Sequence, residues 1–313
     1  MSIRNLAIGM VCLLQTLTGV VGNSFLLYHY LFLYFTGYRL KPMDFIVNNL
    51  IVANFSVLLY SGFPYSILSF GWYNVYSDIR CKLLAYLREV GRGVSIGTTC
   101  LLSSFQAITI SPMNSRWANL KHKAPKYIVP TIFMYWILQM LINVVYLVFL
   151  SSKLINRNIT NRKHFEYCSS VRHDATRDFL YAALIASPDV VCFLIVLWAS
   201  GSMVFILHRH KQRVQHIHRT SIFSRSSPES RATKTILLLV STFVFLNTLS
   251  SIFRILLSIL KNPSWFILST NAVLSLSFPS VSPFLILGRD SNISRFSFTW
   301  KRNANFCHRR RNM

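Results

Sequence analysis

The stretch CKLLAYLREVGRGVSIGTTCLLSSFQAITISPMNSRWANLKHKAPKY, residues 81–127, decides the fold of this chain. It opens with a cysteine, carries four charges in its first half (Lys82, Arg88, Glu89 and Arg92), and then runs from 93 to 115 without a charge. A helix needs about 18–20 mostly apolar residues to cross the hydrocarbon of a bilayer. We therefore expect residues 82–110 to form a membrane-spanning helix, followed by a basic loop that ends before Tyr127.

Six further windows contain no Asp, Glu, Lys or Arg, and each is long enough to cross a bilayer: 5–38, 45–77, 127–152, 190–208, 235–253 and 262–288. The 313 residues are 52% hydrophobic and only 13% charged. The sequence therefore predicts an all-α membrane protein, one domain over 1–313, built as a seven-transmembrane-helix bundle. The expected helices cover 8–35, 45–68, 82–110, 127–150, 179–207, 235–260 and 265–287, with a basic cytoplasmic tail over 288–313.

The first apolar run is too long for the hydrophobic region of a signal peptide, which has about 7–15 residues. We interpret it as a retained first helix. Of the 33 Lys and Arg residues, twenty fall on the side of the bilayer opposite the N-terminus and ten on the side of the N-terminus. Because basic residues accumulate on the cytoplasmic side, the N-terminus is expected outside and the C-terminus inside the cell.

The net charge of +24 would indicate a nucleic-acid partner in a soluble protein. Here the basic residues stand in blocks between the apolar windows, where they determine topology and contact anionic lipid. We therefore expect the lipid bilayer, and no nucleic acid, as the partner of these charges.

Two cysteines, Cys81 and Cys168, are the only ones of six that this topology places on the oxidising outer side. We expect them to form a disulfide that ties the longest outer loop to the start of the third helix; two free thiols are the alternative. The same loop carries a glycosylation sequon at Asn158. Two other sequons, at Asn54 and Asn292, fall inside a helix and on the cytoplasmic side.

Charged side chains inside the spans are the main candidates for function, because each costs at least about 2.5–3.5 kcal/mol at the centre of a bilayer. They are Arg88, Glu89, Arg92, Asp189 and Arg254. Arg92 is expected on the order of 16 Å below Cys81, and Asp189 roughly 15 Å deep. Two interpretations remain open. The charges either pair with one another and only fix the packing, or line a cavity whose arginines select a polar or anionic ligand.

The sequence contains no His-Glu-x-x-His, Gly-x-Ser-x-Gly or glycine-rich phosphate motif, so it predicts neither an enzyme nor a cofactor. Four histidines occur close together in a basic segment without acids or cysteines, which disfavours a metal site: His208, His210, His216 and His218. A transporter or channel is disfavoured because the chain has no internal repeat and no series of buried carboxylates.

Several long motifs resemble one family. Residues 90–112 (VGRGVSIGTTCLLSSFQAITISP) and 115–127 (SRWANLKHKAPKY) are similar to the third-helix signature of vomeronasal type-1 receptors. The segments 197–204 (LWASGSMV), 208–217 (HRHKQRVQHI), 227–244 (SPESRATKTILLLVSTFV) and 278–284 (FPSVSPF) resemble the same family. The resemblance extends over essentially the whole chain.

The resemblance implies a G-protein-coupled pheromone receptor of vomeronasal neurons, located in the plasma membrane. It implies a small pheromone-like ligand in the outer half of the bundle and a heterotrimeric G protein at the inner face. Matching positions give the Cys81–Cys168 disulfide and a glycan on Asn158. The residues expected to face the G protein are basic and cytoplasmic: Arg116, Lys121, Lys123, Arg209, Arg213 and Arg231.

The chain departs from rhodopsin-like receptors in its signalling motifs. Residues 108–112 stand where an Asp-Arg-Tyr triad is usual, and Asn54 stands where an Asp is usual. The sixth helix has no proline and the seventh has no Asn-Pro-x-x-Tyr. A bitter-taste-like receptor is the alternative within the same class, and the third-helix run favours the vomeronasal family over it.

Overall fold

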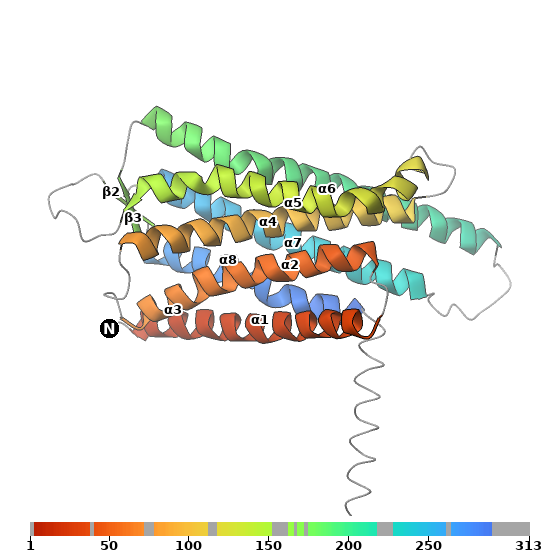
Figure 1. Ribbon diagram of the computed structural model, residues 1–313, viewed down its shortest axis with the longest axis horizontal. Coiled ribbons are helices and arrows are strands. Elements are labelled where there is room, and N and C mark those ends of the chain that lie inside the picture. Colours follow the sequence, from red (N-terminus) through yellow and green to blue (C-terminus); the bar gives the residue numbers. More distant parts are fainter. Residues whose placement is uncertain are drawn as a thin grey trace, which may run out of the picture.

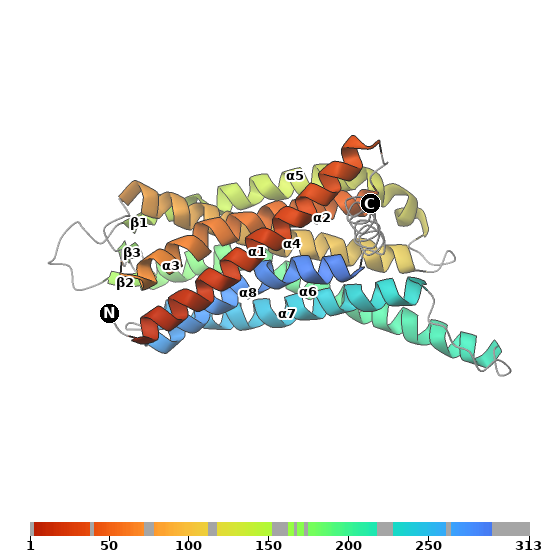
Figure 2. The same cartoon turned by 90° about the horizontal axis from the view of Figure 1, so that it is seen from below.

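The computed structural model describes residues 3–37, 41–71, 78–111, 118–151, 162–165, 168–171, 175–217, 228–260 and 264–289. Within these ranges, seven long helical segments lie side by side as a bundle (Figures 1 and 2). They are α1 (Ile3–Phe35), α2 (Pro42–Val57) continued by η1 (Leu58–Gly62) and α3 (Phe63–Ser69), α4 (Asp78–Ile110), α5 (Ala118–Phe149), α6 (Ala175–Ile217), α7 (Pro228–Ile259) and α8 (Trp265–Arg289). The predicted fold class is confirmed.

Among the described residues, six segments are long and apolar enough to cross a membrane: Ile3–Phe35, Pro42–Ser69, Ile79–Ile110, Lys123–Val148, Ala186–Ile206 and Trp265–Gly288. Helix α7 contains the remaining uncharged window found in the sequence, 235–253. We call the end of the bundle where α1 begins the outer end, following the charge asymmetry, and the opposite end the inner end.

Three helices extend beyond the predicted boundaries at the inner end. Helix α5 begins at Ala118 and not at Tyr127, so the expectation of a loop over 118–126 was wrong. Helix α6 continues to Ile217, and α7 already begins at Pro228. Uncharged windows mark only the part of a helix that lies in hydrocarbon. Lys, Arg and Gln are good helix formers, so these helices continue into the headgroup and water layers.

Helix α4 occupies the centre of the bundle. It contacts α2, α5, α6 and α7, and its outer part contacts a short strand. Its apolar window is 67% buried inside the protein, against 17% for the window of α5 and 28% for that of α1. The residues of α4 are therefore the ones best placed to connect the other helices.

Glycines allow the neighbours of α4 to approach closely. At Gly91, an added Cβ would come within 2.6 Å of Ser56 Cβ and 3.2 Å of the Ala53 carbonyl oxygen on α2. Gly93 and Gly97, four residues apart, lie directly against side chains of α5. Small residues at this spacing are typical of close helix contacts in membranes, where dispersion and polar contacts replace the hydrophobic effect.

Buried amide and hydroxyl groups connect the same helices. Asn54 on α2 donates to Ser282 Oγ on α8 at 2.9 Å and accepts from Ser95 Oγ on α4 at 3.0 Å. Asn23 on α1 donates to the carbonyl oxygen of Pro279 on α8 at 3.1 Å. Proline has no backbone N–H, so a carbonyl oxygen in the preceding turn of its helix lacks its usual donor. Polar side chains of neighbouring helices, such as Asn23, can donate to carbonyl oxygens of this kind inside the bilayer.

A small antiparallel sheet lies at the outer end and was not predicted. Its strands are β1 (Leu150–Ser151), β2 (Arg162–Phe165) and β3 (Cys168–Val171), in the order β1-β3-β2. Strand β1 contacts α4. Cys81, at the start of α4, is buried and disulfide-bonded, whereas Cys12, Cys100 and Cys192 are thiols that form no disulfide.

The side chain of Cys168 is not described, so its pairing with Cys81 stays a prediction. Asn158 lies outside the described residues, as does the predicted tail from residue 290 onward. Helix α8 includes Gly288 and Arg289, which were expected to begin that tail.

Close packing at Gly91 can be tested by adding one methyl group. We expect Gly91→Ala to destabilise the bundle by about 1–3 kcal/mol, because the Cβ would overlap Ser56 and the backbone of α2. Gly201→Ala on α6 is the matched control, since nothing lies within 4 Å of its Cβ position. The control should be neutral or stabilising by up to about 1 kcal/mol. Thermal unfolding of the purified protein measures both, and equal midpoints for the two variants would contradict the prediction.

Candidate functional site

The five charged residues singled out inside the spans come together in the outer half of the bundle. Three lie on α4 (Arg88, Glu89 and Arg92), and α6 and α7 contribute Asp189 and Arg254. Arg92 is about 20 Å along α4 from the first residue of that helix. We call these five residues the charge cluster.

Glu89 is the centre of the charge cluster. Its Oε2 accepts from Arg92 Nε at 3.0 Å and from Arg254 Nη2 at 2.9 Å, and its Oε1 accepts from Arg88 Nε at 3.2 Å. Arg92 follows Glu89 by three residues, so one helical turn brings the two side chains to the same face. Arg254 comes from another helix. Glu89 therefore connects α4 to α7.

The second carboxylate, Asp189, connects α4 to α6. Its Oδ2 lies 2.8 Å from Arg92 Nη1. Asp189 directly follows Pro188, which lies inside α6. Arg92 thus binds Glu89 through Nε and Asp189 through Nη1, using the fork of donors that distinguishes arginine from lysine. A single guanidinium therefore joins both carboxylates of the cluster.

The charge cluster is unbalanced and partly open. Three guanidinium groups face two carboxylates, which leaves one positive charge when all five are ionised. The side chain of Glu89 is 5% exposed, whereas that of Arg254 is 25% exposed. The carboxylate is therefore enclosed while a guanidinium can still be reached. The structure brings together all five predicted residues, and it pairs them with one another.

Sequence reasoning missed Tyr146 on α5, which completes the surroundings of the cluster. This half-buried side chain packs against Cys81 and Ala85 and interacts electrostatically with Glu89 and the three arginines. A tyrosine in an apolar window gives no signal by itself, because tyrosines are common at membrane interfaces. Only its position beside Cys81 and the charge cluster reveals the contact.

Deeper in the bundle, uncharged groups replace the charges. Gln139 donates to Tyr135 Oη at 3.0 Å, and Tyr135 Oη lies 3.5 Å from Cys192 Sγ, one turn below Asp189. Asn49 donates to Thr98 Oγ1 at 2.6 Å and accepts from Trp136 Nε1 at 2.7 Å. These contacts join α2, α4, α5 and α6 below the charge cluster.

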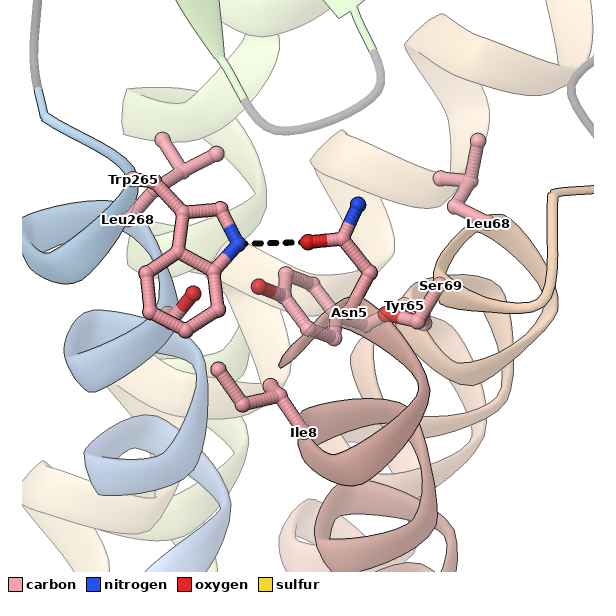
Figure 3. Close-up of a pocket in the computed structure, with 8 residues that line it drawn as sticks. Asn5, Ile8, Tyr65, Leu68, Ser69, Trp265 and Leu268 are labelled. Carbon is pink, nitrogen blue, oxygen red and sulfur yellow. Dashed lines mark hydrogen bonds between the residues drawn. The ribbon is translucent and has the colours of Figure 1, made fainter. Parts of the chain in front are cut away.

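A separate small cavity lies at the outer end between α1, α3 and α8 (Figure 3). Its volume is about 120 Å³, and it is lined by Asn5, Ile8, Tyr65, Leu68, Ser69, Trp265, Leu268 and Ser269. Trp265 Nε1 donates to Asn5 Oδ1 at 2.6 Å, and the Arg4 guanidinium lies 5.6 Å from the centre of the Trp265 ring. A cavity of about 150 Å³ holds benzene, so this one accommodates only a very small molecule. No charged residue lines it.

The structure describes some of the basic residues that the sequence predicted to face a G protein at the inner end. Lys123 on α5 and Arg209 on α6 are exposed, and Lys121 is half-buried. Arg213 and Arg231 belong to α6 and α7, but their side chains are not described, and Arg116 lies outside the described residues. His208 is exposed on α6, and no group of three or more metal-binding side chains occurs in the part of the chain that is described.

Comparison with known proteins gives a consistent result. Residues 6–299 match the vomeronasal organ pheromone receptor family. The chain belongs to this family. It is 47% identical to vomeronasal type-1 receptor 4 of Homo sapiens over 302 residues, which covers 96% of this chain and 100% of that protein. It is 44% identical to vomeronasal type-1 receptor 2 of Homo sapiens, with 96% of this chain and 76% of that protein covered.

More distant members agree. Vomeronasal type-1 receptor 90 of Rattus norvegicus is 33% identical over 286 residues, covering 90% of each chain. The protein is therefore a vomeronasal pheromone receptor of the G-protein-coupled class, a multi-pass protein of the cell surface and not an enzyme. Family membership decides against the bitter-taste-like and transporter alternatives that the sequence left open.

Because Glu89 lies at the centre of the charge cluster, we expect its replacement by a neutral residue to destabilise the receptor. Glu89→Gln would leave three guanidinium groups facing one carboxylate in the bundle, and breaking such a buried pair costs about 3–5 kcal/mol. We expect lower surface expression and a lower unfolding midpoint. Asp44→Asn is the control, because Asp44 accepts a hydrogen bond from Lys41 N at the start of α2, and the side-chain oxygen of asparagine caps a helix about as well. Equal losses in the two variants would contradict the central role of Glu89.

Proposed function

We propose that the receptor binds a small polar or anionic ligand at the charge cluster and activates a heterotrimeric G protein at its inner end. The observation that supports this most strongly is the unbalanced cluster in the outer half of the bundle. Three arginines and two carboxylates join α4, α6 and α7 there, and the side chain of Arg254 is 25% exposed. An anionic group would complete the charge balance that the protein leaves open.

Energetics favour an anion at this position. Moving an arginine into a bilayer is costly unless it is paired or hydrated, and among the described residues the cluster contains two carboxylates and three arginines. Arg254 contacts Glu89 through Nη2, so its other guanidinium donors, together with Nη2 of Arg92, are the groups proposed to bind a carboxylate or sulfate group. The ligand-binding residues proposed are those of the charge cluster: Arg88, Glu89, Arg92, Asp189 and Arg254. The cavity at Trp265 has no charged side chain in its lining, so it does not offer this chemistry.

The inner end supports the second half of the proposal. Helices α5, α6 and α7 extend beyond the apolar windows and carry basic residues there. Figure 2 shows the inner end of α6 projecting beyond the neighbouring helices. We propose that the G protein docks on this basic surface, which comprises Arg116, Lys121, Lys123, Arg209, Arg213 and Arg231. Complementary charge would steer an acidic partner element to it.

Two features of the outer loop complete the proposal. We infer that Cys81 pairs with Cys168, which is supported by the disulfide-bonded state of Cys81 and by the position of β3 beside β1, the strand that contacts α4. The loop thus would be held over the outer end of α4. We also infer that Asn158 carries a glycan, since its loop faces the extracellular side in the predicted topology.

Loss of a ligand-facing arginine should reduce potency. Sulfate esters and carboxylates are screened beside their neutral parent alcohols, with calcium release as the readout, and the most potent agonist is used for the variants. We expect Arg92→Gln to raise the half-maximal concentration at least about 10-fold, because a hydrogen bond to a charged group is worth about 1.5–3 kcal/mol. Arg80→Gln, on the same helix but near its exposed outer end, is the control. Unchanged potency of Arg92→Gln at equal surface expression would refute the site.

Charge reversal at the inner end should weaken signalling without changing ligand binding. We expect Lys123→Glu combined with Arg209→Glu to slow agonist-stimulated nucleotide exchange at least about 5-fold, since like charges across an interface repel an acidic partner. Both side chains are exposed, so folding should be retained. Arg80→Glu makes a similar charge change at the outer end and should leave exchange unaltered. If the control slows exchange as much as the double variant, the proposed docking surface is wrong.

A further inference from the structure

The side chains of helix α7 that the structure describes make very few polar contacts with the other helices. Between side chains that the structure describes, the Arg254–Glu89 pair is the one hydrogen bond from α7 to another helix. The other polar side chains of α7 with hydrogen bonds donate to carbonyl oxygens of α7 itself: Ser241, Asn247 and Thr248. Among the described side chains, the polar connection of α7 to the rest of the bundle thus depends on Arg254.

Apolar packing holds α7 mainly to α8 and not to α4. Helix α7 packs along α8, and the rings of Phe243 and Phe278 meet edge to face with centroids 4.9 Å apart. Its contact with α4 is slight by comparison. Apolar contacts lack direction, so they permit α7 to shift against α8. The Glu89–Arg254 pair fixes α7 relative to α4.

Opening this pair leaves a balanced set of charges behind. If Arg254 leaves, Glu89 keeps both Arg88 and Arg92, and the remaining cluster has two guanidinium groups and two carboxylates. If Glu89 were lost instead, a net charge of two would remain. Arg254 is also the most exposed member of the cluster. It is therefore the partner that an incoming anion can take over.

We propose that the Glu89–Arg254 pair is a latch that holds α7 against α4 in the resting receptor. The anionic group of the ligand opens the latch by replacing Glu89 as the partner of Arg254. This inference rests on the ligand site proposed above. Helix α7 is a continuous helix from Pro228 to Ile259, about 48 Å long. A change at its outer end therefore reaches the inner end, where α6 and α7 carry the proposed G-protein surface.

The test measures basal nucleotide exchange on a co-expressed G protein in the absence of ligand, at matched surface expression. We expect Arg254→Gln to raise basal exchange at least about fivefold, equivalent to about 1 kcal/mol of stabilisation lost from the resting state. Arg254→Lys keeps the charge but loses the fork, so its basal exchange should be intermediate. Thr248→Val, on the same helix, and Arg80→Gln, with the same chemical change, should leave basal exchange at the wild-type value.

Arg88→Gln separates the latch from a general effect of charge. It gives the cluster the same net charge as Arg254→Gln, yet Arg88 and Glu89 lie on the same helix, so α7 keeps its contact. Basal exchange should rise less than in Arg254→Gln, and an equal rise would overturn the latch. Basal exchange at the wild-type level in both Arg254 variants would also overturn it. If Arg254→Gln does not reach the cell surface, Arg254→Lys is measured in its place, and a wild-type level of basal exchange in that variant would overturn the latch.

The experiments can refute the latch and the ligand site independently of each other. Raised basal exchange in the Arg254 variants, with unchanged agonist potency in Arg92→Gln, would support the latch and refute the ligand site. Reduced potency in Arg92→Gln, with basal exchange unaltered in the Arg254 variants, would support the ligand site and refute the latch.

Discussion

One buried carboxylate determines how the outer half of this receptor is held together. Glu89 accepts hydrogen bonds from three arginines, at 2.9–3.2 Å. None of these guanidinium groups would be stable in a bilayer without a partner, so the position of Glu89 fixes where all three lie. Because Arg254 comes from α7 and Arg92 also binds Asp189 of α6, this requirement brings three helices to one point. The packing of the outer half therefore follows from charge neutralisation more than from shape.

Below this point, α4 connects its neighbours by a different means. Its charged face gives way to a face of glycines, where α2 and α5 approach the backbone itself. Between them, amides and hydroxyls such as Asn54 and Ser95 supply the directional contacts. Charge links α4 to α7 and adds to the close packing of α4 against α6, while close packing and neutral hydrogen bonds hold α4 to α2 and α5. The neutral contacts of α4 with α2 and α5 carry no excess charge that could attract an anionic ligand. The outer and inner halves of the bundle therefore differ in how a ligand could change them.

The sequence predicts the fold well and the site only in part. Uncharged windows reveal the seven helices because hydrocarbon excludes ions, and the same cost singles out the five charged residues of the cluster. The sequence did not determine which of these residues contact one another. Several arginines were close enough to pair with Glu89, and the sequence does not show which faces of α6 and α7 point toward α4. Tyr146 and the strands β1–β3 were missed because tyrosine is ordinary in a membrane helix and short strands in a long loop have no period. The start of α5 at Ala118 was missed because a basic segment between two apolar windows was interpreted as a loop, although its residues have good helix propensity.

The inner end of α4 explains where the signalling surface has to lie. Rhodopsin-like relatives carry a charged triad there, but this chain has Ile108, Thr109, Ile110 and Ser111. Gln106, about one turn before this end, is buried, and its amide donates to Met43 Sδ at 3.8 Å. Helix α4 thus offers a partner no charge at this end. The charges stand instead on the extensions of α5, α6 and α7, beyond the hydrocarbon, where a helix carries Lys and Arg at little cost. Two of these three extensions belong to helices that meet at the charge cluster, so changes at that cluster and at the basic surface pass through the same two rigid elements.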